Sequence, residues 1–417
     1  MSTGKKMQAT REGKAKFHAF LLPENKNIQE DLDNWEEKDV PTKKMPVFYN
    51  PRMLLNRDLS VMAIDALKGA FRYGCNIADV MCGVGIRGIR YLVEASTEDM
   101  HVDFVDINPA ATMTCKKNLQ LNKIEDSRFE IYNKDANEFL YEKGLIEESR
   151  FHAIDIDPFG NPMQYISGAI KALRRDGLLQ VVATDLAVLA GVHWKAARRK
   201  YLVRPLRPVS YHAEVAIRIL FGAIFRKAIE LDATIKPVFS MARNHYIKLT
   251  VQKQYGASNA NADFHNLGYM IHCRDCLQHY TVELDDLIDV KKCQFCSSIK
   301  LRYGGPLWIG ELQDKEKINN ILSNANSKLE YMKKFNESIK ILKFCAESFG
   351  FPPGSQDIHV ISKELSHSPP TLEEIIEELG LMGIPASRDV FNPVALKTPG
   401  TRNEIKEAFN RAIARRT

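Results

Sequence analysis

The sequence has 417 residues, of which 45% are hydrophobic and 26% are charged, and it carries a net charge of +6. This composition argues against a disordered, collagen-like or low-complexity chain, and the longest apolar run, Ile219–Phe225, is far shorter than the roughly 18 residues of a membrane span. The length predicts two or three domains. The weak positive charge is compatible with nucleic acid without establishing it, and eight cysteines are few enough to favour an intracellular protein.

The N-terminal segment is basic and lacks the apolar run of a secretory signal. Residues 1–16 contain five basic side chains against one acid, Glu12. We expect a solvated basic tail here and assign residues 1–44 to an N-terminal extension, with a mitochondrial leader as the alternative.

Between Cys75 and Thr184, short apolar stretches alternate with helical patterns. Strands are expected at Asn76–Val80, His101–Val105, Phe129–Tyr132, His152–Ile156 and Gly177–Ala183. Helices are expected at Ile86–Ala95, Pro109–Leu121 and Pro162–Leu173. This alternation predicts an α/β fold with a parallel sheet, and such sheets bind ligands beyond the carboxyl ends of their strands.

A glycine-rich loop follows the first predicted strand. Gly83, Gly85 and Gly88 fit the pattern G-x-G-x-x-G, in which glycines allow a tight turn and a close approach to a ligand. Alone this pattern is weak, because it also allows a dinucleotide site or a turn used only for packing.

Acidic residues at successive strand ends favour S-adenosylmethionine as the ligand of this loop. Asp79 precedes the glycines, where a carboxylate can bind the cofactor's ammonium group. Asp106 follows the second strand, where it can accept hydrogen bonds from ribose hydroxyls. Asp135 and Ala136 follow the third strand, where an acid can meet the adenine amino group. We therefore prefer a cofactor site to a packing turn.

The tetrapeptide Asp157-Pro158-Phe159-Gly160 follows the fourth strand. One reaction that such a loop could serve is methylation of the exocyclic amine of guanine. The lone pair of that nitrogen is delocalised into the ring, so a carboxylate and a carbonyl that accept its two N–H bonds would make it a better nucleophile. Asp157 can supply the carboxylate, Pro158 a rigidly presented carbonyl, and Phe159 a face for a flipped base. The alternative is a turn in which Asp157 caps and Phe159 is core. We assign a structural role to Asp155, which we expect to point to the other side of the strand.

The stretch between Asp185 and Glu214 contains no acidic residue. We expect RNA phosphates to contact its basic side chains, among them Lys195, Arg198, Arg199 and Lys200. A solvated helical face is the alternative. The last predicted helix, Asn403–Arg416, is a second basic candidate for RNA contact.

Two C-x-x-C pairs predict a zinc site. Cys273 and Cys276 are separated from Cys293 and Cys296 by 16 residues, a spacing typical of a four-thiolate zinc ribbon with a structural role. Free thiols or disulfides are the alternative. Cys75, Cys82, Cys115 and Cys345 are scattered, and we expect them to be buried or incidental.

The remaining elements are expected in the C-terminal half. A long helix at Tyr211–Leu231, a strand pair at Ile235–Val251 and a polar linker at Gln254–Phe264 precede the cysteines. Helices follow at Asp314–Leu329, Glu330–Ser348 and Thr371–Leu379.

Over about residues 45 to 400 the chain resembles the tRNA (guanine-26, N2)-dimethyltransferase family. Besides Asp157–Gly160, the resemblance rests on Val47–Pro51, Asn56–Val61, Ala183–Ala187, Arg199–Tyr201, Glu214 with Arg218–Leu220, His245-Tyr246 and Gly305–Gly310. The resemblance implies that Phe48, Arg57, Arg87, Asp106, Asp135 and Ala136 contact S-adenosylmethionine. It also implies that Asp157 is the principal catalytic residue, that Glu214 assists it, and that a C-terminal domain contacts tRNA.

The chain departs from the family pattern at three places. Ala213 stands where the family usually has histidine, Asn244 where it has aspartate, and Asp389-Val390 where it has Thr-His. Two motif residues also have simpler interpretations. Glu214 and Arg218 have the spacing of a helical ion pair, and Asp185 can cap the helix that begins at Leu186.

We therefore expect a class I methyltransferase domain at 45–265, a zinc-binding unit at 266–304 within an α+β C-terminal part, and a mainly helical tRNA-contacting domain at 305–417. The expected function is methylation of the N2 amine of guanine-26 in tRNA. The alternatives are another tRNA or rRNA guanine, a tRNA-binding protein with reduced catalysis, and an NAD oxidoreductase. We expect a cytoplasmic monomer without a membrane partner, with the nucleus or mitochondrion left open.

Overall fold

The computed structural model describes residues 7–20, 45–66, 74–95, 99–243, 245–325 and 329–416. The chain forms two compact units. The first comprises residues 1–158, 164–181 and 319–340, and the second comprises residues 159–163, 182–318 and 341–417. The four-part division that the sequence suggests stays a prediction.

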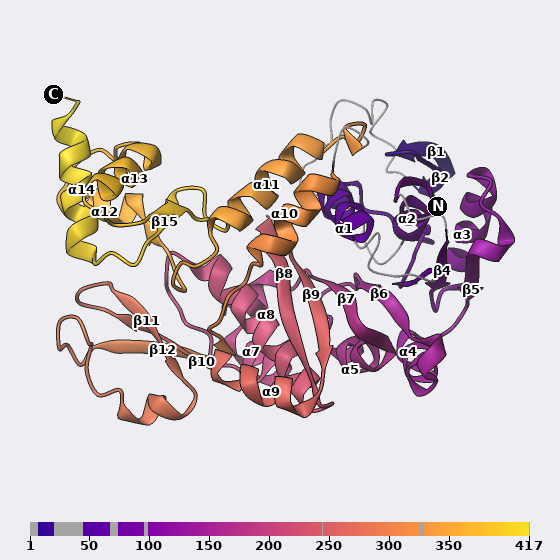
Figure 1. The fold of residues 1–417 in the computed structure, drawn as a ribbon, viewed down its shortest axis with the longest axis horizontal. Helices are drawn as coiled ribbons and strands as arrows, with labels where there is room; N and C mark the ends of the chain where they lie inside the picture. The colour runs from indigo at the N-terminus through magenta and orange to yellow at the C-terminus, as the bar shows by residue number, and fades with distance from the viewer. Residues whose placement is uncertain are drawn as a thin grey trace, which may run out of the picture. The chain divides into compact units, whose positions relative to one another are not determined.

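The first unit is built on parallel strands (Figure 1). They are β3 (Cys75–Val80), β4 (Met100–Val105), β5 (Phe129–Tyr132), β6 (Phe151–Ile156) and β7 (Leu173–Ala183), whose last two residues belong to the second unit. Their order is β5-β4-β3-β6-β7, and the four neighbouring pairs are parallel. Every residue of β6 is buried, as expected for a strand covered on both faces. The α/β expectation is confirmed.

Helices connect these strands. They are α2 (Ile86–Glu94), α3 (Pro109–Leu121), α4 (Ala136–Leu145) and α5 (Met163–Ala172), and a further helix, α1 (Leu54–Ala66), precedes β3. The predicted start of α3 is confirmed, because the Asn108 side chain accepts a hydrogen bond from the backbone N–H of Ala110 and Pro109 takes the first helical position.

The N-terminal segment differs from the expected solvated tail. β1 (Met7–Glu12) and β2 (Ala15–Phe20) form an antiparallel hairpin in which the side chains of Glu12 and Phe17 are buried. Apolar residues alternate along β2, and this period of two places one face in the core despite the surrounding charge. Residues 1–6 and 21–44 lie outside the described residues.

The second unit combines helices with antiparallel strands. Its first part contains α6 (Leu186–Leu189), α7 (Trp194–Tyr201), α8 (His212–Ile229), β8 (Ala233–Arg243), β9 (Tyr246–Tyr255) and α9 (Ala257–Asp263). β8 and β9 confirm the predicted strand pair. The linker prediction was wrong, because α9 occupies most of 254–264. Alanines favour this helix, and Asp263 at its end accepts a hydrogen bond from the Thr234 hydroxyl at 2.6 Å.

A three-stranded sheet follows in the order β11-β10-β12. Its strands are β10 (Leu267–Cys273), β11 (His279–Glu283) and β12 (Leu301–Trp308). The remaining elements are α10 (Lys315–Asn324), α11 (Phe335–Glu347), β13 (Gln356–Asp357), α12 (Ile358–Leu365), α13 (Leu372–Leu381), β14 (Ser387–Arg388), β15 (Ala395–Lys397) and α14 (Arg402–Ala414). The predicted C-terminal helices are confirmed as α10, α11, α13 and α14.

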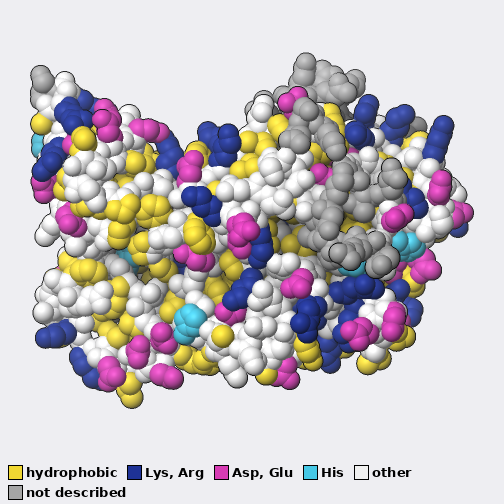
Figure 2. Space-filling view, viewed as in Figure 1, with side chains coloured by type: hydrophobic (Ala, Val, Ile, Leu, Met, Phe, Trp, Pro, Cys, Tyr) yellow, Lys and Arg dark blue, Asp and Glu magenta, His cyan; other side chains and the backbone are white. Residues whose placement is uncertain are grey.

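Helices α12, α13 and α14 share one apolar core that includes Ile361, Ile375, Leu379, Ile405 and Phe409. Over these helices, basic and acidic side chains stand side by side at the surface (Figure 2). In the described part of the chain, no helix combines the length and the apolar character needed to cross a membrane.

Candidate active site and basic surfaces

The glycine loop requires glycine for steric reasons. Gly83 and Gly85 have φ angles of 56° and 78°, in the left-handed region that favours glycine. A Cβ atom at Gly83 would lie 2.8 Å from the Phe48 carbonyl oxygen, and one at Gly85 would lie 2.4 Å from the Cys115 sulfur. The loop is therefore pressed against its neighbours, and it opens α2 directly.

The acids predicted after β4 and β5 lie at the expected strand ends. The Asp106 carboxylate accepts hydrogen bonds from the backbone N–H groups of Gly83 and Asn108, both at 2.9 Å, and burial raises its pKa. Asp135 caps α4 by accepting from the Asn137 N–H at 2.8 Å, and Ala136 is the first residue of that helix. A carboxylate has about four lone-pair positions, so each acid retains acceptor capacity for a ligand.

Asp79 lies under the loop. Its carboxylate is buried and accepts a hydrogen bond from the Gly88 N–H at 2.9 Å. Burial raises its pKa to about 7, although the nearby Arg87 guanidinium acts in the opposite direction. A buried carboxylate of this kind gains stabilisation from a further cation, which fits the ammonium group of the predicted cofactor.

Arg87 joins the glycine-loop helix to the predicted catalytic residue. Its Nη2 forms an ion pair with Asp157, and its Nε lies 3.3 Å from Asp155 on the same strand. Its Nη1 donates to the Asn56 side chain at 3.0 Å and to the Ser60 hydroxyl at 2.8 Å. Burial alone would lower the Arg87 pKa, but the two carboxylates raise it. The guanidinium is therefore fixed and charged beside Asp157.

The Asp157 side chain remains 24% exposed, whereas Asp155 is buried. Asp155 also accepts a hydrogen bond from the Tyr91 hydroxyl at 2.8 Å. This arrangement supports the structural role predicted for Asp155. The predicted orientation was wrong, because Arg87 contacts both carboxylates and residues two apart along a strand point to the same face. It leaves Asp157, at the carboxyl end of β6, as the acid that a ligand can reach.

Arg57 has a protein partner that sequence reasoning missed. Its Nε and Nη2 donate to the Glu12 carboxylate at 2.6 and 2.7 Å, and Arg90 donates to the same carboxylate at 2.9 Å. Burial alone would raise the Glu12 pKa, but the two arginines lower it to about 2. The single acid within a basic run was the available signal, because a buried guanidinium needs a carboxylate. The contact of Arg57 with S-adenosylmethionine stays a prediction.

The loop after Asp157 is anchored within the second unit. The Gly160 N–H donates to the Thr184 hydroxyl at 2.8 Å, and the Thr184 N–H donates to the Gly160 carbonyl at 3.0 Å. The Phe159 side chain is 45% exposed, so the core alternative does not describe it.

The capping role predicted for Asp185 was wrong. The Asp185 side chain makes no capping hydrogen bond to α6. Instead it accepts a hydrogen bond from the Tyr201 hydroxyl at 2.7 Å, because Tyr201 at the end of α7 is buried and needs an acceptor.

Glu214 lies in a buried ion cluster of the second unit. Its carboxylate contacts Arg218 at 2.7 Å and Lys397 at 2.9 Å, and it accepts from the Gly354 N–H at 3.0 Å. Burial alone would raise its pKa, but Lys397 and Arg218 lower it to about 2. The ion-pair interpretation is confirmed, and the assisting role in catalysis stays a prediction.

One family departure adds to this cluster. Asp389 is buried, and burial raises its pKa to about 6 while Lys397 lowers it. Ala213 lies on α8 beside Glu214, and Asn244 lies outside the described residues.

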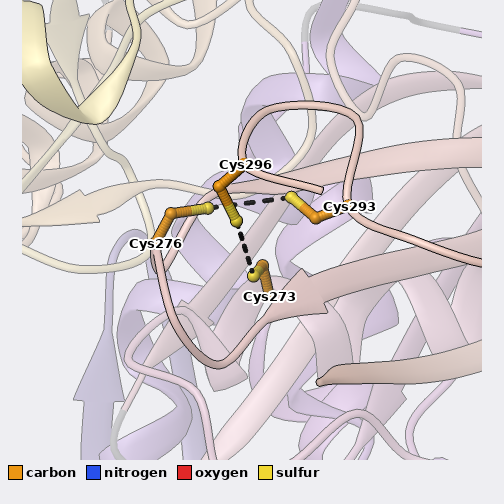
Figure 3. Close-up of side chains that lie close together, drawn as sticks. All are labelled: Cys273, Cys276, Cys293 and Cys296. Carbon is orange, nitrogen blue, oxygen red and sulfur yellow. Dashed lines mark hydrogen bonds between the residues drawn. The ribbon is translucent and has the colours of Figure 1, made fainter. Parts of the chain in front are cut away.

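The four predicted zinc ligands converge (Figure 3). All Sγ atoms of Cys273, Cys276, Cys293 and Cys296 lie within 4.8 Å of one another. The Sγ atoms of Cys273 and Cys296 are 3.6 Å apart, and those of Cys276 and Cys293 are 3.7 Å apart. Thiolates bound tetrahedrally at about 2.3 Å from zinc would lie about 3.8 Å apart, so the donor set fits this ion. None of the eight cysteines, all within the described residues, forms a disulfide, and the other four are buried as expected.

The basic side chains predicted to contact RNA lie on α7. Lys195, Arg198, Arg199 and Lys200 are exposed, and only Lys200 among them has an acidic partner in the described part of the chain, Asp185 at 3.5 Å. The segment Arg402–Arg416, which contains α14, differs, because each of its basic residues pairs with an acid. The ion pairs are Arg402–Glu364, Lys406–Glu364, Arg411–Glu407, Arg415–Glu378 and Arg416–Glu374.

The sequence matches one protein family over residues 27–410, described as N2,N2-dimethylguanosine tRNA methyltransferase. The chain belongs to this family. It is 34% identical over 368 residues to the tRNA (guanine(26)-N(2))-dimethyltransferase of Methanothermobacter thermautotrophicus, covering 88% of this chain and 93% of that protein. It is 36% identical over 321 residues to the tRNA (guanine(26)-N(2)/guanine(27)-N(2))-dimethyltransferase of Aquifex aeolicus, covering 76% and 80%.

A solved structure supports the family assignment at the level of the fold. The complex of Trm1 from Pyrococcus horikoshii with S-adenosyl-L-methionine has a TM-score of 0.78 and 30% sequence identity, and the match covers 96% of this chain and 99% of that one. The resemblance that the sequence motifs indicated is confirmed.

Proposed function

We propose that this member of the family transfers methyl groups from S-adenosylmethionine to the exocyclic N2 amine of guanine-26 in tRNA. The products would be N2-methylguanosine and N2,N2-dimethylguanosine. The observation that carries this proposal is the fixed Arg87–Asp157 ion pair, which places an accessible carboxylate at the carboxyl end of β6, one strand away from the glycine loop.

The residues at this edge of the sheet fit the cofactor. S-adenosylmethionine would supply a methyl group bound to a positively charged sulfur. Close packing against Phe48 and Cys115 holds the Gly83–Gly85 loop at the carboxyl end of β3, and the buried Asp79 offers a negative partner for the ammonium group of the cofactor. Asp106 would accept from the ribose, with Asp135 and Ala136 beside the adenine. Phe48, Arg57 and Arg87 complete the proposed cofactor residues.

Asp157 would accept one N–H bond of the guanine amine and Pro158 would accept the other through its carbonyl oxygen. These two acceptors hold the nitrogen lone pair towards the methyl group. As the nitrogen–carbon bond forms and the carbon–sulfur bond breaks, the sulfur keeps the bonding electrons and the amine loses a proton towards Asp157. Phe159 offers an exposed ring on which the guanine can stack.

The test is to incubate the protein with S-adenosylmethionine and unmodified tRNA, digest the RNA to nucleosides and weigh them. Mono- and dimethylguanosine are the expected products. Asp157→Asn should lower the rate on the order of a hundredfold or more. Asp126→Asn, at an exposed aspartate, is the matched control and should leave the rate unchanged. A protein that forms no methylguanosine contradicts the proposal, and a fully active Asp157→Asn variant contradicts the catalytic assignment.

Guanine-27 is a second candidate target, favoured by the likeness to the Aquifex aeolicus protein. Mapping the modified position in the product tRNA separates the two targets. Substituting adenosine at position 26 should abolish the product if guanine-26 alone is methylated, and should leave product if guanine-27 is also used.

We further propose that Lys195, Arg198, Arg199 and Lys200 contact tRNA phosphates, and that the protein acts as a cytoplasmic monomer.

The four cysteines would hold one structural Zn²⁺, which would link the end of β10 to the segment that precedes β12. Metal analysis of the purified protein should find about one zinc per chain. A content well below this contradicts the zinc proposal.

A further inference from the structure

The second unit contains a cavity of about 530 Å³, and Arg198 is the one lining residue to which the proposed function assigns a role. Residues from α7, from the segment that follows it and from β12 line this cavity. They are Trp194, Arg198, Arg204, Pro205, Leu206, Arg207, Arg302 and Tyr303, and we call them the arginine pocket. The volume lies in the range of sites that hold small organic ligands, about 300–1,000 Å³.

Backbone contacts fix the walls of the arginine pocket. Arg204 and Gly305 exchange two backbone hydrogen bonds of 2.8 and 2.9 Å, which join the segment after α7 to β12. A Cβ atom at Gly304 would lie 2.5 Å from Leu206, and one at Gly191 would lie 2.6 Å from Pro205. These close approaches leave little freedom for the walls to move, so the pocket is formed before any ligand arrives.

The side chains of the pocket combine positive charge with aromatic faces. The Arg204 guanidinium lies 4.2 Å from the centre of the Tyr303 ring, and the Arg198 guanidinium lies 5.9 Å from that of Trp194. Trp194 is 41% exposed and Tyr303 is 38% exposed. Large exposed rings beside guanidinium groups are typical of surfaces on which nucleic-acid bases stack.

The arginines of the pocket lack acidic partners among the described residues. Arg207 donates to the Val192 carbonyl at 3.5 Å and Arg302 donates to the Pro208 carbonyl at 3.3 Å, and both acceptors are neutral. Four guanidinium groups around one cavity therefore produce a positive potential that attracts an anion, and guanidinium groups bind phosphate oxygens through paired, charge-assisted hydrogen bonds.

We propose that the arginine pocket binds one unpaired nucleotide of the RNA substrate, distinct from the guanine that is methylated. The arginines hold its phosphate, and its base stacks on Trp194 or Tyr303. This inference rests on the proposed function for the identity of the RNA. A base-paired nucleotide has both faces covered by its neighbours, so the aromatic walls select a nucleotide that leaves the helical stack.

The experiment measures binding of a short single-stranded RNA to the full-length protein by quenching of tryptophan fluorescence. The sequence has three tryptophans, Trp35, Trp194 and Trp308. Trp194 is exposed and Trp308 is buried, so when Trp35 is replaced by phenylalanine in every protein used, quenching by RNA reports on Trp194. The single strand should bind on the order of tenfold more tightly than a duplex of the same length. Inorganic phosphate at the same concentration should give little quenching, because it has no base to stack.

Variants then locate the site. Arg204→Ala and Trp194→Ala should each weaken binding of labelled single-stranded RNA, measured by anisotropy, by about tenfold. Trp194→Phe keeps a ring and should bind nearly as well as the parent while losing the quenching signal. Arg175→Ala removes an equal charge from an exposed position outside the pocket and is the matched control. Circular dichroism verifies that each variant is folded.

Three results would overturn the inference. If Arg204→Ala and Arg175→Ala weaken binding equally, the arginine pocket does not bind the RNA. If the duplex binds as tightly as the single strand, the pocket does not select an unpaired nucleotide. If phosphate alone quenches as strongly as RNA, the pocket is only an anion site. The methylation assay separates these results from failure of the proposed function, since a protein without methylation activity can still show pocket-dependent RNA binding, and an active enzyme can lack it.

Discussion

Two basic regions of the second unit differ in what surrounds their charges. In the arginine pocket, Arg198, Arg204, Arg207 and Arg302 meet aromatic rings and carbonyl oxygens, without an acidic partner in the described part of the chain. In the segment Arg402–Arg416, which contains α14, all five basic residues form ion pairs with glutamates. The count of basic residues is similar, but only the pocket has charge left for a phosphate. Therefore the acidic side chains that pair with a basic segment, rather than its number of basic residues, decide whether that segment can bind RNA.

The largest expected effect tests whether α14 serves stability. Arg402→Ala should lower the free energy of unfolding by about 2–3 kcal/mol, because Arg402 is buried and bonds to both Glu364 and Gln356. The pocket variant Arg198→Ala should change it by less than about 0.5 kcal/mol. Urea denaturation measures both variants. If the two are equally stable, the assignment of α14 to stability fails.

The next effect concerns tRNA affinity. Arg204→Ala with Arg207→Ala should weaken tRNA binding on the order of tenfold at low salt, and should reduce the slope of log affinity against log salt by about 2. The α14 pair Arg411→Ala with Arg416→Ala should change the affinity by less than about twofold. Filter binding at several salt concentrations measures both. A steeper loss for the α14 pair would reverse the comparison.

A smaller effect is expected when a basic residue at the end of α14 loses its acidic partner and so resembles the arginines of the pocket. Glu374→Gln removes the acidic partner of Arg416 and should raise tRNA affinity at low salt by about twofold, since one cation becomes available to phosphate. Glu316→Gln removes an equal negative charge from an exposed site on α10 and serves as the control. Equal gains in the two variants would mean that only net charge matters.

The smallest effect is a pH dependence carried by α14. Burial alone would raise the pKa of Glu364, but its bonds with Arg402 and Lys406 lower it below its ordinary value of 4.5. The stabilisation from these pairs is therefore complete above that value and is lost as the pH falls through the lower, folded-state pKa. Thermal unfolding between neutral and acidic pH should show this loss in the parent protein and less of it in Arg402→Ala. Parallel pH profiles would contradict the assignment.

Much of the first unit could be predicted because its signals are local. Strand periodicity, the spacing of Gly83 and Gly85, and the Asn108-Pro109 helix start act within a few residues, and each lies in the structure where the sequence placed it. The zinc ligands were predictable for the same reason, since each C-x-x-C pair places two thiolates on one turn.

The contacts that distinguish the site could not be predicted, because they join distant segments. Arg87 and Asp157 are 70 residues apart, and Glu12 and Arg57 are 45 apart. Charge patterns alone left α14 as a second candidate beside α7, because the glutamates that pair with α14 lie partly on α12 and α13. The arginine pocket needed the pairing of Arg204 with Gly305, which no local pattern indicates.

The division of the first unit into separate stretches of sequence has a consequence for its synthesis. The Lys334 N–H donates to the Asp58 carboxylate at 3.1 Å across 276 positions, and residues 319–340 belong to the first unit. A chain emerging from the ribosome has therefore already exposed residues 182–318 when the first unit receives its last segment. A fragment that stops at Val181 lacks that segment. We therefore expect the first unit to fold by itself only when residues 319–340 are joined to this fragment.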